Sequence, residues 1–314
     1  MRRDRLARGK FIRFIRLVSL MFFVTVVIFV LMRKQEHSLI SPISSSALRS
    51  EIPARDTKGV TDSQLRSVVE ESLKDAKGDY AVVVYNLKTN ENFSINEHKE
   101  FDAGSLYKLW VMGAVYEQLE SGIWKEDTVL SEEISILNEK FNLATESAEL
   151  AEGKISLPVK TALERMITIS DNYSALLLAW KLRLSKVTSY MDTKGFAESK
   201  LGGAETLPTT TAYDIALFFE RLYGGQLAPS DTTSKMISLL KAQKLNNKLP
   251  KLLPEKTVIA HKTGELGLAT HDAGIVYSPK GDYIIVVMSK SNLPKGAEER
   301  IAQLSKNVFE YFEK

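Results

Sequence analysis

Strand patterns lie at both ends of residues 61–314, and helical patterns lie between them. This order constrains the fold more than any other feature of the sequence. If strands alternated with helices along the chain, a parallel sheet would be indicated, so the separation predicts an α+β fold instead. We expect an antiparallel sheet flanked by terminal helices, beside an all-helical subdomain. The strand-like runs are Tyr80–Tyr85, Asn92–Ile95, Val258–His261, Ala273–Tyr277 and Tyr283–Met288.

The helical patterns are bounded by start and stop residues. Thr61 and Gln64 form a capping box before the first helix, and Gly122 ends a helix that begins at Ser105. Residues 130–200 are expected to be mostly helical. Further helices are expected at about 105–120, 211–222, 233–240 and 297–312.

A long apolar run, Leu17–Met32, lies near the N-terminus and is bordered by basic residues. Counted from Phe11, a helix over this run is about 33 Å long, enough to span the hydrocarbon core of a membrane. The basic residues before the run predict a cytoplasmic N-terminus by the positive-inside rule. These residues are Arg2, Arg3, Arg5, Arg8 and Lys10.

The chain is therefore expected to have four parts. A cytoplasmic tail (1–10) precedes a transmembrane anchor (11–32) and a stalk (33–60), and the extracytoplasmic domain follows (61–314). Within that domain, we expect 61–104 and 242–314 to form an α/β part and 105–241 a helical part. A cleaved signal peptide is the alternative for the apolar run, but Arg33, Lys34 and Glu36 follow it at once, where cleavage requires small residues.

Composition excludes several classes of site and partner. The chain has no cysteine, so a disulfide framework and a thiol nucleophile are excluded. Its 4 histidines are scattered, so a histidine-rich metal site is not expected. No metal or organic cofactor is implied by the sequence. The net charge of +3 arises from the N-terminal basic residues, and the remainder of the chain is mildly acidic. Nucleic acid is therefore not an expected partner.

Ser105-Leu106-Tyr107-Lys108 opens the helix expected from residue 105. A serine becomes a nucleophile when a base removes its proton, and Lys108 lies one helical turn away on the same face. Lysine can be that base when burial or a second cation lowers its pKa. A second S-x-x-K at 238–241 is interpreted as the surface of an amphipathic helix, because the pattern alone is weak.

Two further short motifs stand at boundaries of expected elements. Ser170-Asp171-Asn172 lies between two helical patterns and by itself is typical of a helix N-cap. The motif at 262–264, Lys-Thr-Gly, follows a strand pattern and by itself is typical of a strand end with a turn glycine. The combination of all three motifs in this order is far more specific than any one of them.

With these motifs, residues 61–314 resemble the class A β-lactamases and penicillin-binding proteins, whose signature set is S-x-x-K, S-D-N and K-T-G in this order. The likeness extends beyond the motifs. Residues 78–95 resemble the first hairpin of the family, 209–214 its TTxxD helix start, and 271–277 the strand after K-T-G.

The resemblance implies catalytic roles for four residues. Ser105 would be the acylated nucleophile and Lys108 the group that accepts its proton. Ser170 would pass a proton toward the leaving nitrogen. Lys262 would supply positive charge beside Ser170 and help to lower the pKa of Lys108.

The resemblance also implies a set of substrate-binding residues. Asn172 would hydrogen-bond the acyl-amide side chain of the substrate, and Thr263 with Lys262 would bind its carboxylate. Gly264, between Thr263 and Glu265, would line the site. The backbone N–H groups of Ser105 and Glu265 would form the oxyanion hole.

The sequence departs from the class A pattern between Asn172 and Thr209. Class A enzymes carry an E-x-x-L-N loop there, whose glutamate activates the water for deacylation, and this interval is short and lacks the motif. We interpret Glu198 and Glu205, the carboxylates nearest to the pattern, as solvated loop residues. Without this glutamate Ser105 could still be acylated, but deacylation would lack its base. Turnover is therefore expected to be slow.

Three functions remain open from the sequence. The first is a serine hydrolase of class A β-lactamase type, anchored in a bacterial cell membrane. The second uses the same nucleophile on D-Ala-D-Ala peptides or other acyl compounds, with β-lactams as slow acylating ligands. The third is a non-catalytic domain that binds the cell wall, which the full set of motif residues disfavours. Oligomeric state stays open.

Overall fold

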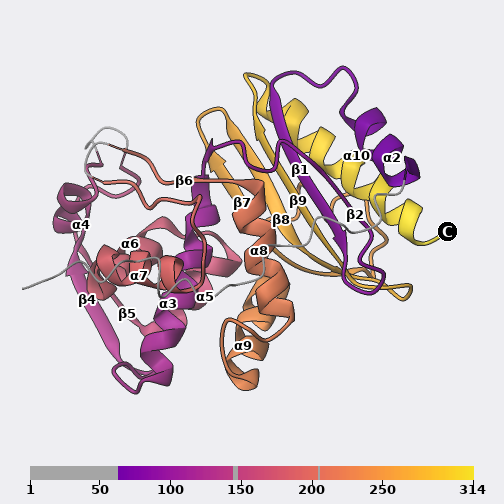
Figure 1. Ribbon diagram of the computed structural model, residues 1–314. Helices are drawn as coiled ribbons and strands as arrows, with labels where there is room; N and C mark the ends of the chain where they lie inside the picture. Colours follow the sequence, from indigo (N-terminus) through magenta and orange to yellow (C-terminus); the bar gives the residue numbers. More distant parts are fainter. Residues whose placement is uncertain (1–62, 144–147, 204–205) are drawn as a thin grey trace, which may run out of the picture. The chain divides into compact units, whose positions relative to one another are not determined.

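The computed structural model describes residues 63–143, 148–203 and 206–314. Their main feature is an antiparallel sheet with the strand order β2-β1-β9-β8-β7 (Figure 1). Strand β1 pairs with β9 along its whole length, so segments from opposite ends of the domain lie side by side. The expected α+β fold with an antiparallel sheet is confirmed. The strands are β1 (Asp79–Asn86), β2 (Asn92–Ile95), β7 (Val258–Leu266), β8 (Ala269–Tyr277) and β9 (Tyr283–Lys290).

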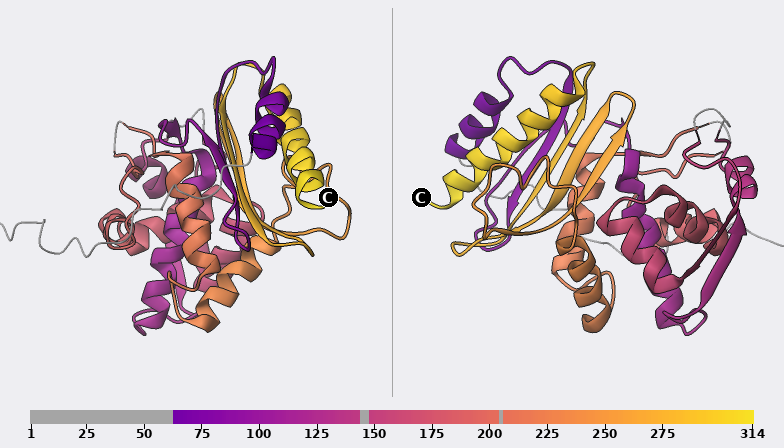
Figure 2. Two further views of the ribbon diagram at one scale, coloured as in Figure 1. Left: turned by 45° about the vertical axis from the view of Figure 1, so that its right-hand side comes forward. Right: turned by 180° about the vertical axis from the view of Figure 1, so that it is seen from behind.

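The terminal helices α2 (Ser63–Leu73) and α10 (Pro294–Phe312) cover one face of the sheet (Figure 2). Alternate side chains of a strand point to opposite faces. Thus Val82 and Val84 pack with these two helices, while Val83 belongs to the core on the other face. The helices expected at the two ends of the domain are therefore present and lie where the fold class required.

The other face of the sheet is covered by α8 (Ala212–Tyr223), and the remaining helices extend from there. Helix α3 (Lys108–Glu120) is buried around its whole circumference over its first turns, so it is the centre of the helical part. The helices packed around it are α4 (Ile134–Lys140), α5 (Val159–Thr168), α6 (Asn172–Leu182), α7 (Leu184–Thr193) and α9 (Ser230–Lys241).

Three local expectations need correction. Residues 130–200 include a strand ladder between β4 (Val129–Glu133) and β5 (Lys154–Pro158), whose strands of 5 residues each are too short to give a distinct pattern. The helix expected from Ser105 begins with a 3₁₀ turn, η1 (Gly104–Tyr107), before α3. The Lys-Thr-Gly motif lies inside β7 and pairs with β8, rather than following the strand. The short strands β3 (Phe101–Asp102) and β6 (Thr209–Thr210) pair beside η1.

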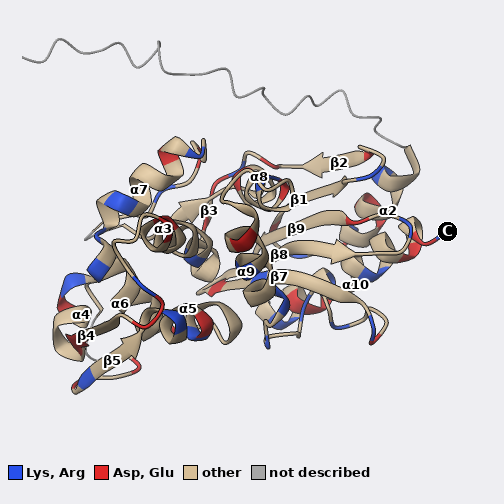
Figure 3. Cartoon of the chain, turned by 90° about the horizontal axis from the view of Figure 1, so that it is seen from below, with Lys and Arg blue, Asp and Glu red and all other residues tan. Residues whose placement is uncertain are grey.

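The expected anchor at 11–32, the stalk at 33–60 and the start of the capping box lie outside the described residues. Among the helices that the structure describes, none has the length and apolar character needed to cross a bilayer. Basic and acidic residues are interspersed along the described elements rather than gathered by sign (Figure 3).

His271 of β8 joins the sheet to the residues that precede η1. Its ring is wholly buried; Nε2 lies 2.8 Å from the carbonyl oxygen of Asp102, and Nδ1 accepts from the backbone N–H of Ser289. Nδ1 can accept only when it carries no proton, so these partners select the neutral ring with its hydrogen on Nε2. Burial lowers the pKa of His271 to about 4.

The first prediction concerns this histidine and pH. Between pH 6.5 and 4 the unfolded chain binds a proton at His271 that the folded chain does not, so the free energy of unfolding should fall as pH falls through this window. The fall due to His271 is about 3 kcal/mol. Urea unfolding of the natural protein and of His271→Gln at pH 4 to 8 should show the difference, and parallel curves would contradict it.

The second prediction concerns the crossing of α3 and α7. A Cβ atom on Gly113 would lie 2.2 Å from the ring of the buried Tyr190. Gly113→Ala should therefore lower the free energy of unfolding by about 1–3 kcal/mol, although alanine favours a helix. Gly296→Ala in α10 is the control, because a Cβ there makes only an ordinary contact. Equal stabilities for the two variants in urea unfolding would disprove the crowding at Gly113.

Candidate active site

The turn that carries Ser105 is pressed closely against β7, and glycines allow the approach. Gly104 has a φ of +48°, and a Cβ on it would lie 2.8 Å from the backbone nitrogen of Glu265. A Cβ on Gly264 would lie 2.9 Å from the carbonyl oxygen of Ala103. The lack of side chains at both positions therefore brings the backbone at Ser105 next to that of Glu265. This is the pair of N–H groups that the sequence analysis assigned to an oxyanion hole.

The Ser170-Asp171-Asn172 segment forms the turn between α5 and α6. Asp171 is the N-cap of α6, and its carboxylate accepts from the backbone N–H of Ser174 at 2.7 Å. The same carboxylate pairs with Arg165 of α5 at 3.2 Å. Ser170 adopts the left-handed conformation with a φ of +57°, which is unusual for a serine. Both its carbonyl and its hydroxyl oxygen then contact Lys108.

The ammonium group of Lys108 is wholly buried and is surrounded by acceptors from this turn. Nζ lies 2.6 Å from the carbonyl oxygen of Ser170, 3.2 Å from its Oγ and 2.8 Å from Oδ1 of Asn172. An ammonium group has three hydrogens, so these acceptors can use all of them. Lys108 thus bonds residues of the second motif. Among the described contacts, its Nζ makes no hydrogen bond to Ser105, which lies one turn earlier.

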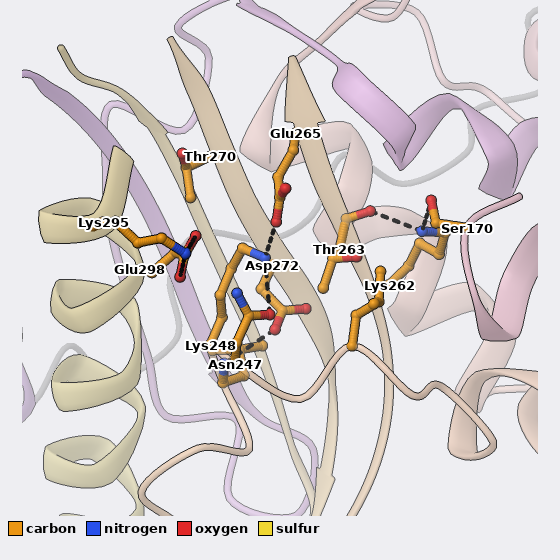
Figure 4. A network of polar contacts seen from close by, with 12 residues as sticks. Ser170, Asn247, Lys248, Lys262, Thr263, Glu265, Thr270, Asp272, Lys295 and Glu298 are labelled. Carbon is orange, nitrogen blue, oxygen red and sulfur yellow. Dashed lines mark hydrogen bonds and ion pairs between the residues drawn. The ribbon is translucent and has the colours of Figure 1, made fainter. Parts of the chain in front are cut away.

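Lys262 approaches the same hydroxyl from β7. Its Nζ is also wholly buried, and it donates to Oγ of Ser170 at 3.0 Å and to the carbonyl oxygen of Thr263 at 2.9 Å (Figure 4). Oγ of Ser170 therefore accepts from both buried lysine nitrogens. Its own hydrogen is then directed away from both and is available to an acceptor in the site.

Burial is the main cause of a low pKa at both lysines. It lowers the pKa of Lys108 to about 7, against the opposing effect of the carboxylates of Asp171 and Glu149. It also lowers the pKa of Lys262 well below the ordinary value, and the nearby charge of Lys108 acts in the same direction. Near neutral pH, Lys108 is therefore present in appreciable amounts as both amine and ammonium, as a base requires.

Asn172 is exposed at the start of α6, and its amide is oriented by two charged partners. Oδ1 accepts from Lys108, while Nδ2 donates to a carboxylate oxygen of Glu149 at 2.5 Å. A cation on one side and a carboxylate on the other allow only this orientation of the amide. One hydrogen on Nδ2 then remains for a further acceptor.

The three motifs are thus brought together, as the sequence predicted, although the roles of their residues stay predictions. Lys108, Ser170, Asn172 and Lys262 form one hydrogen-bonded group. Thr263, Gly264 and Glu265 continue along β7 beside η1. The second S-x-x-K differs: Ser238 and Lys241 are exposed on α9, and the serine hydroxyl only donates to the backbone of its own helix. That copy is a helix surface, as expected.

The sequence analysis missed a charged group beside the site. Lys248, in the segment between α9 and β7, is wholly buried, and its Nζ lies 2.5 Å from Oε1 of Glu265 (Figure 4). Next to it, the buried pair of His261 and Asp272 is joined at 2.9 Å. A lysine outside any periodic pattern is ordinarily a solvated residue, so nothing in the sequence marked Lys248.

The loop carboxylate at Glu198 has partners of its own. One oxygen accepts from the hydroxyl of Thr211, and the other lies 2.8 Å from Nδ1 of His98. Glu198 is therefore more constrained than the solvated residue that we expected, although its side chain is partly exposed. Glu205 lies outside the described residues.

Comparison with known proteins gives consistent results. Residues 63–312 match the family model of the beta-lactamase enzyme family, Beta-lactamase2. The extended-spectrum beta-lactamase PER-1 of Pseudomonas aeruginosa is 23% identical over 269 residues, which cover 79% of this chain and 87% of that protein. Beta-lactamase VEB-1 of the same organism is 22% identical over 276 residues, covering 78% of this chain and 89% of that protein. The structure of PBP-A is similar in fold, with a TM-score of 0.69 and 22% identity, covering 79% of this chain and 95% of that one.

The match to the family model spans most of the chain and includes all three motifs that meet at Ser170. The fold, the shared hydroxyl and the match together identify a serine hydrolase of β-lactamase type. This chain belongs to the beta-lactamase enzyme family.

Proposed function

We propose that Ser105 is acylated by β-lactams and that the chain hydrolyses the resulting acyl-enzyme slowly. The observation that carries this proposal is the Ser170 hydroxyl held between the two buried nitrogens of Lys108 and Lys262. Such an arrangement provides a base of suitable pKa and a directed proton donor in one place. A related protein supports the ligand class, because a substituted form of PBP-A has been solved as an acyl-enzyme complex with penicillin-G.

Acylation follows from the positions of these groups. Lys108, as the amine, accepts the hydroxyl proton of Ser105 while the serine oxygen attacks the lactam carbonyl carbon. The negative charge on the carbonyl oxygen is stabilised by the N–H groups of Ser105 and Glu265. When the C–N bond breaks, Ser170 donates its free proton to the nitrogen. A proton from Lys108 then replaces the one that Ser170 has lost, through the bond that joins them.

Hydrolysis of the acyl-enzyme requires a base that activates water. Glu198 is the described carboxylate nearest to the class A loop pattern, and it is held by Thr211 and His98 rather than by the group around Ser170. This supports slow deacylation. The same observation favours a second candidate function, a penicillin-binding D-Ala-D-Ala peptidase, for which long-lived β-lactam adducts are the expected side reaction.

We further propose that residues 11–32 anchor the chain in a bacterial cell membrane, with the hydrolase domain outside the cytoplasm. The support is the apolar run with basic residues before it and charged residues directly after it. Fractionation of cells that express the full chain, followed by protease treatment of intact spheroplasts, tests this. Recovery of the domain in the soluble cytoplasmic fraction would disprove it.

The third prediction tests the nucleophile and the turnover together. Incubation with benzylpenicillin should add the mass of the intact penicillin to the protein, and Ser105→Ala should abolish the adduct because the attacking oxygen is removed. Mass spectrometry over time measures the adduct, and absorbance measures hydrolysis. An adduct that persists for minutes or longer supports slow deacylation. An adduct on Ser105→Ala would exclude Ser105 as the nucleophile.

The fourth prediction concerns the pH dependence of acylation. The amine form of Lys108 is the base, so the second-order rate constant should rise with pH through a midpoint near 7 and then level off. Stopped-flow acylation at pH 5.5 to 9 measures the profile. Lys108→Arg should lose acylation across this range, since guanidinium stays protonated. A flat profile for the natural protein would rule out Lys108 as the proton acceptor.

A further inference from the structure

We propose that Glu149 makes the site selective for substrates whose acyl side chain carries a positively charged amino group. The inference rests on the proposed function and names the substrate class of the same site. Its starting point is the 2.5 Å contact between the Glu149 carboxylate and the amide nitrogen of Asn172. Asn172 is the residue assigned to the acyl-amide side chain, so whatever extends beyond that amide lies beside Glu149.

The carboxylate does not compete with the substrate for the last donor on Asn172. The amide nitrogen carries two hydrogens, of which Glu149 takes one. The other can bond the carbonyl oxygen of the acyl amide while Glu149 stays in place. A carboxylate has further lone pairs free, and an ammonium group on the substrate can use them.

The carboxylate is also unnecessary for holding its own segment in place. The next residue, Leu150, is anchored by its backbone: its carbonyl oxygen accepts from the hydroxyl of Tyr173 at 2.7 Å and from Nδ2 of Asn138 at 2.8 Å. Its N–H lies 3.2 Å from the same hydroxyl oxygen. The backbone next to Glu149 is therefore held by bonds that do not involve the Glu149 side chain, and the exposed carboxylate can act on a ligand.

The charges around the site have opposite signs at its two ends. Lys262 and Thr263 stand at the end assigned to the substrate carboxylate, whose negative charge would favour the protonated form of the buried Lys262. Glu149 stands at the acyl end, where the other nearby carboxylate, Asp171, is already paired with Arg165. A substrate with a carboxylate at one end and an amino group at the other matches this distribution.

The fifth prediction uses three penicillins that differ at one position. Ampicillin carries an amino group on the acyl side chain, benzylpenicillin carries hydrogen there, and carbenicillin carries a carboxylate. Acylation rate constants of the full chain should decrease in that order, because Glu149 attracts the first and repels the last. Glu149→Gln should reduce the ratio between the rate constants of successive penicillins by about three- to tenfold, as expected for a charge at this range near the surface. Added salt should weaken the natural series in the same way.

Matched variants separate charge from structure. Glu149→Asp should keep the order of the three penicillins, and Glu152→Gln, at an exposed glutamate of the same segment, should keep both the order and the rates. If Glu149→Gln changes all three rates by one common factor, Glu149 only positions Asn172 and the inference fails while the proposed function stands. Equal rates for the three penicillins in the natural protein also overturn it. No adduct with any of them overturns the proposed function, and this inference with it.

Discussion

Two buried lysine nitrogens share one hydroxyl oxygen, and the rest of the site depends on this contact. Removing a lysine ammonium from water costs several kcal/mol, so neither Lys108 nor Lys262 can be buried without acceptors. The turn at Ser170 provides them, at the expense of a left-handed backbone. The helical part and the sheet each contribute one lysine, so both must be in place before the Ser170 hydroxyl can bond to the two nitrogens. The hydrogen bonds around Ser170 can therefore form only when the helical part and the sheet are correctly packed together.

The contact also explains why the domain needs such close backbone packing. Lys262 lies on the edge strand β7 and Lys108 at the start of the central helix, and the glycine pair Gly104 and Gly264 lets these elements approach. His271 fixes the same region from the next strand by its bond to Asp102. The turn that carries Ser105 is therefore positioned by backbone atoms and a neutral histidine.

Much of this could be predicted from the sequence, because the signals were local. The strands of the sheet have strong β-branched character, so the fold class could be predicted. The members of the hydrogen-bonded group were predicted from the family resemblance that the three motifs carry together. The β4–β5 ladder was missed because its strands are short and contribute little to the core. Glu149 and Lys248 were missed because each acts through a partner from a distant segment, Asn172 and Glu265, which no spacing reveals. The 3₁₀ turn η1 packs against β7, and such a tertiary contact cannot be predicted from local sequence.

The pairing of β1 with β9 has a consequence for how the chain acquires its structure. The two strands are separated by roughly two hundred residues, and all of the helical part lies between them. During synthesis the hairpin of β1 and β2 emerges first, and the edge of β1 that pairs with β9 stays unpaired until nearly the whole polypeptide has been made. Helices of the middle segment can form early from local contacts, but the sheet is completed only after β9 has been synthesised. A chain that stops before β9 leaves β1 without its main partner. Premature termination therefore yields an aggregation-prone hairpin edge rather than a shorter active enzyme.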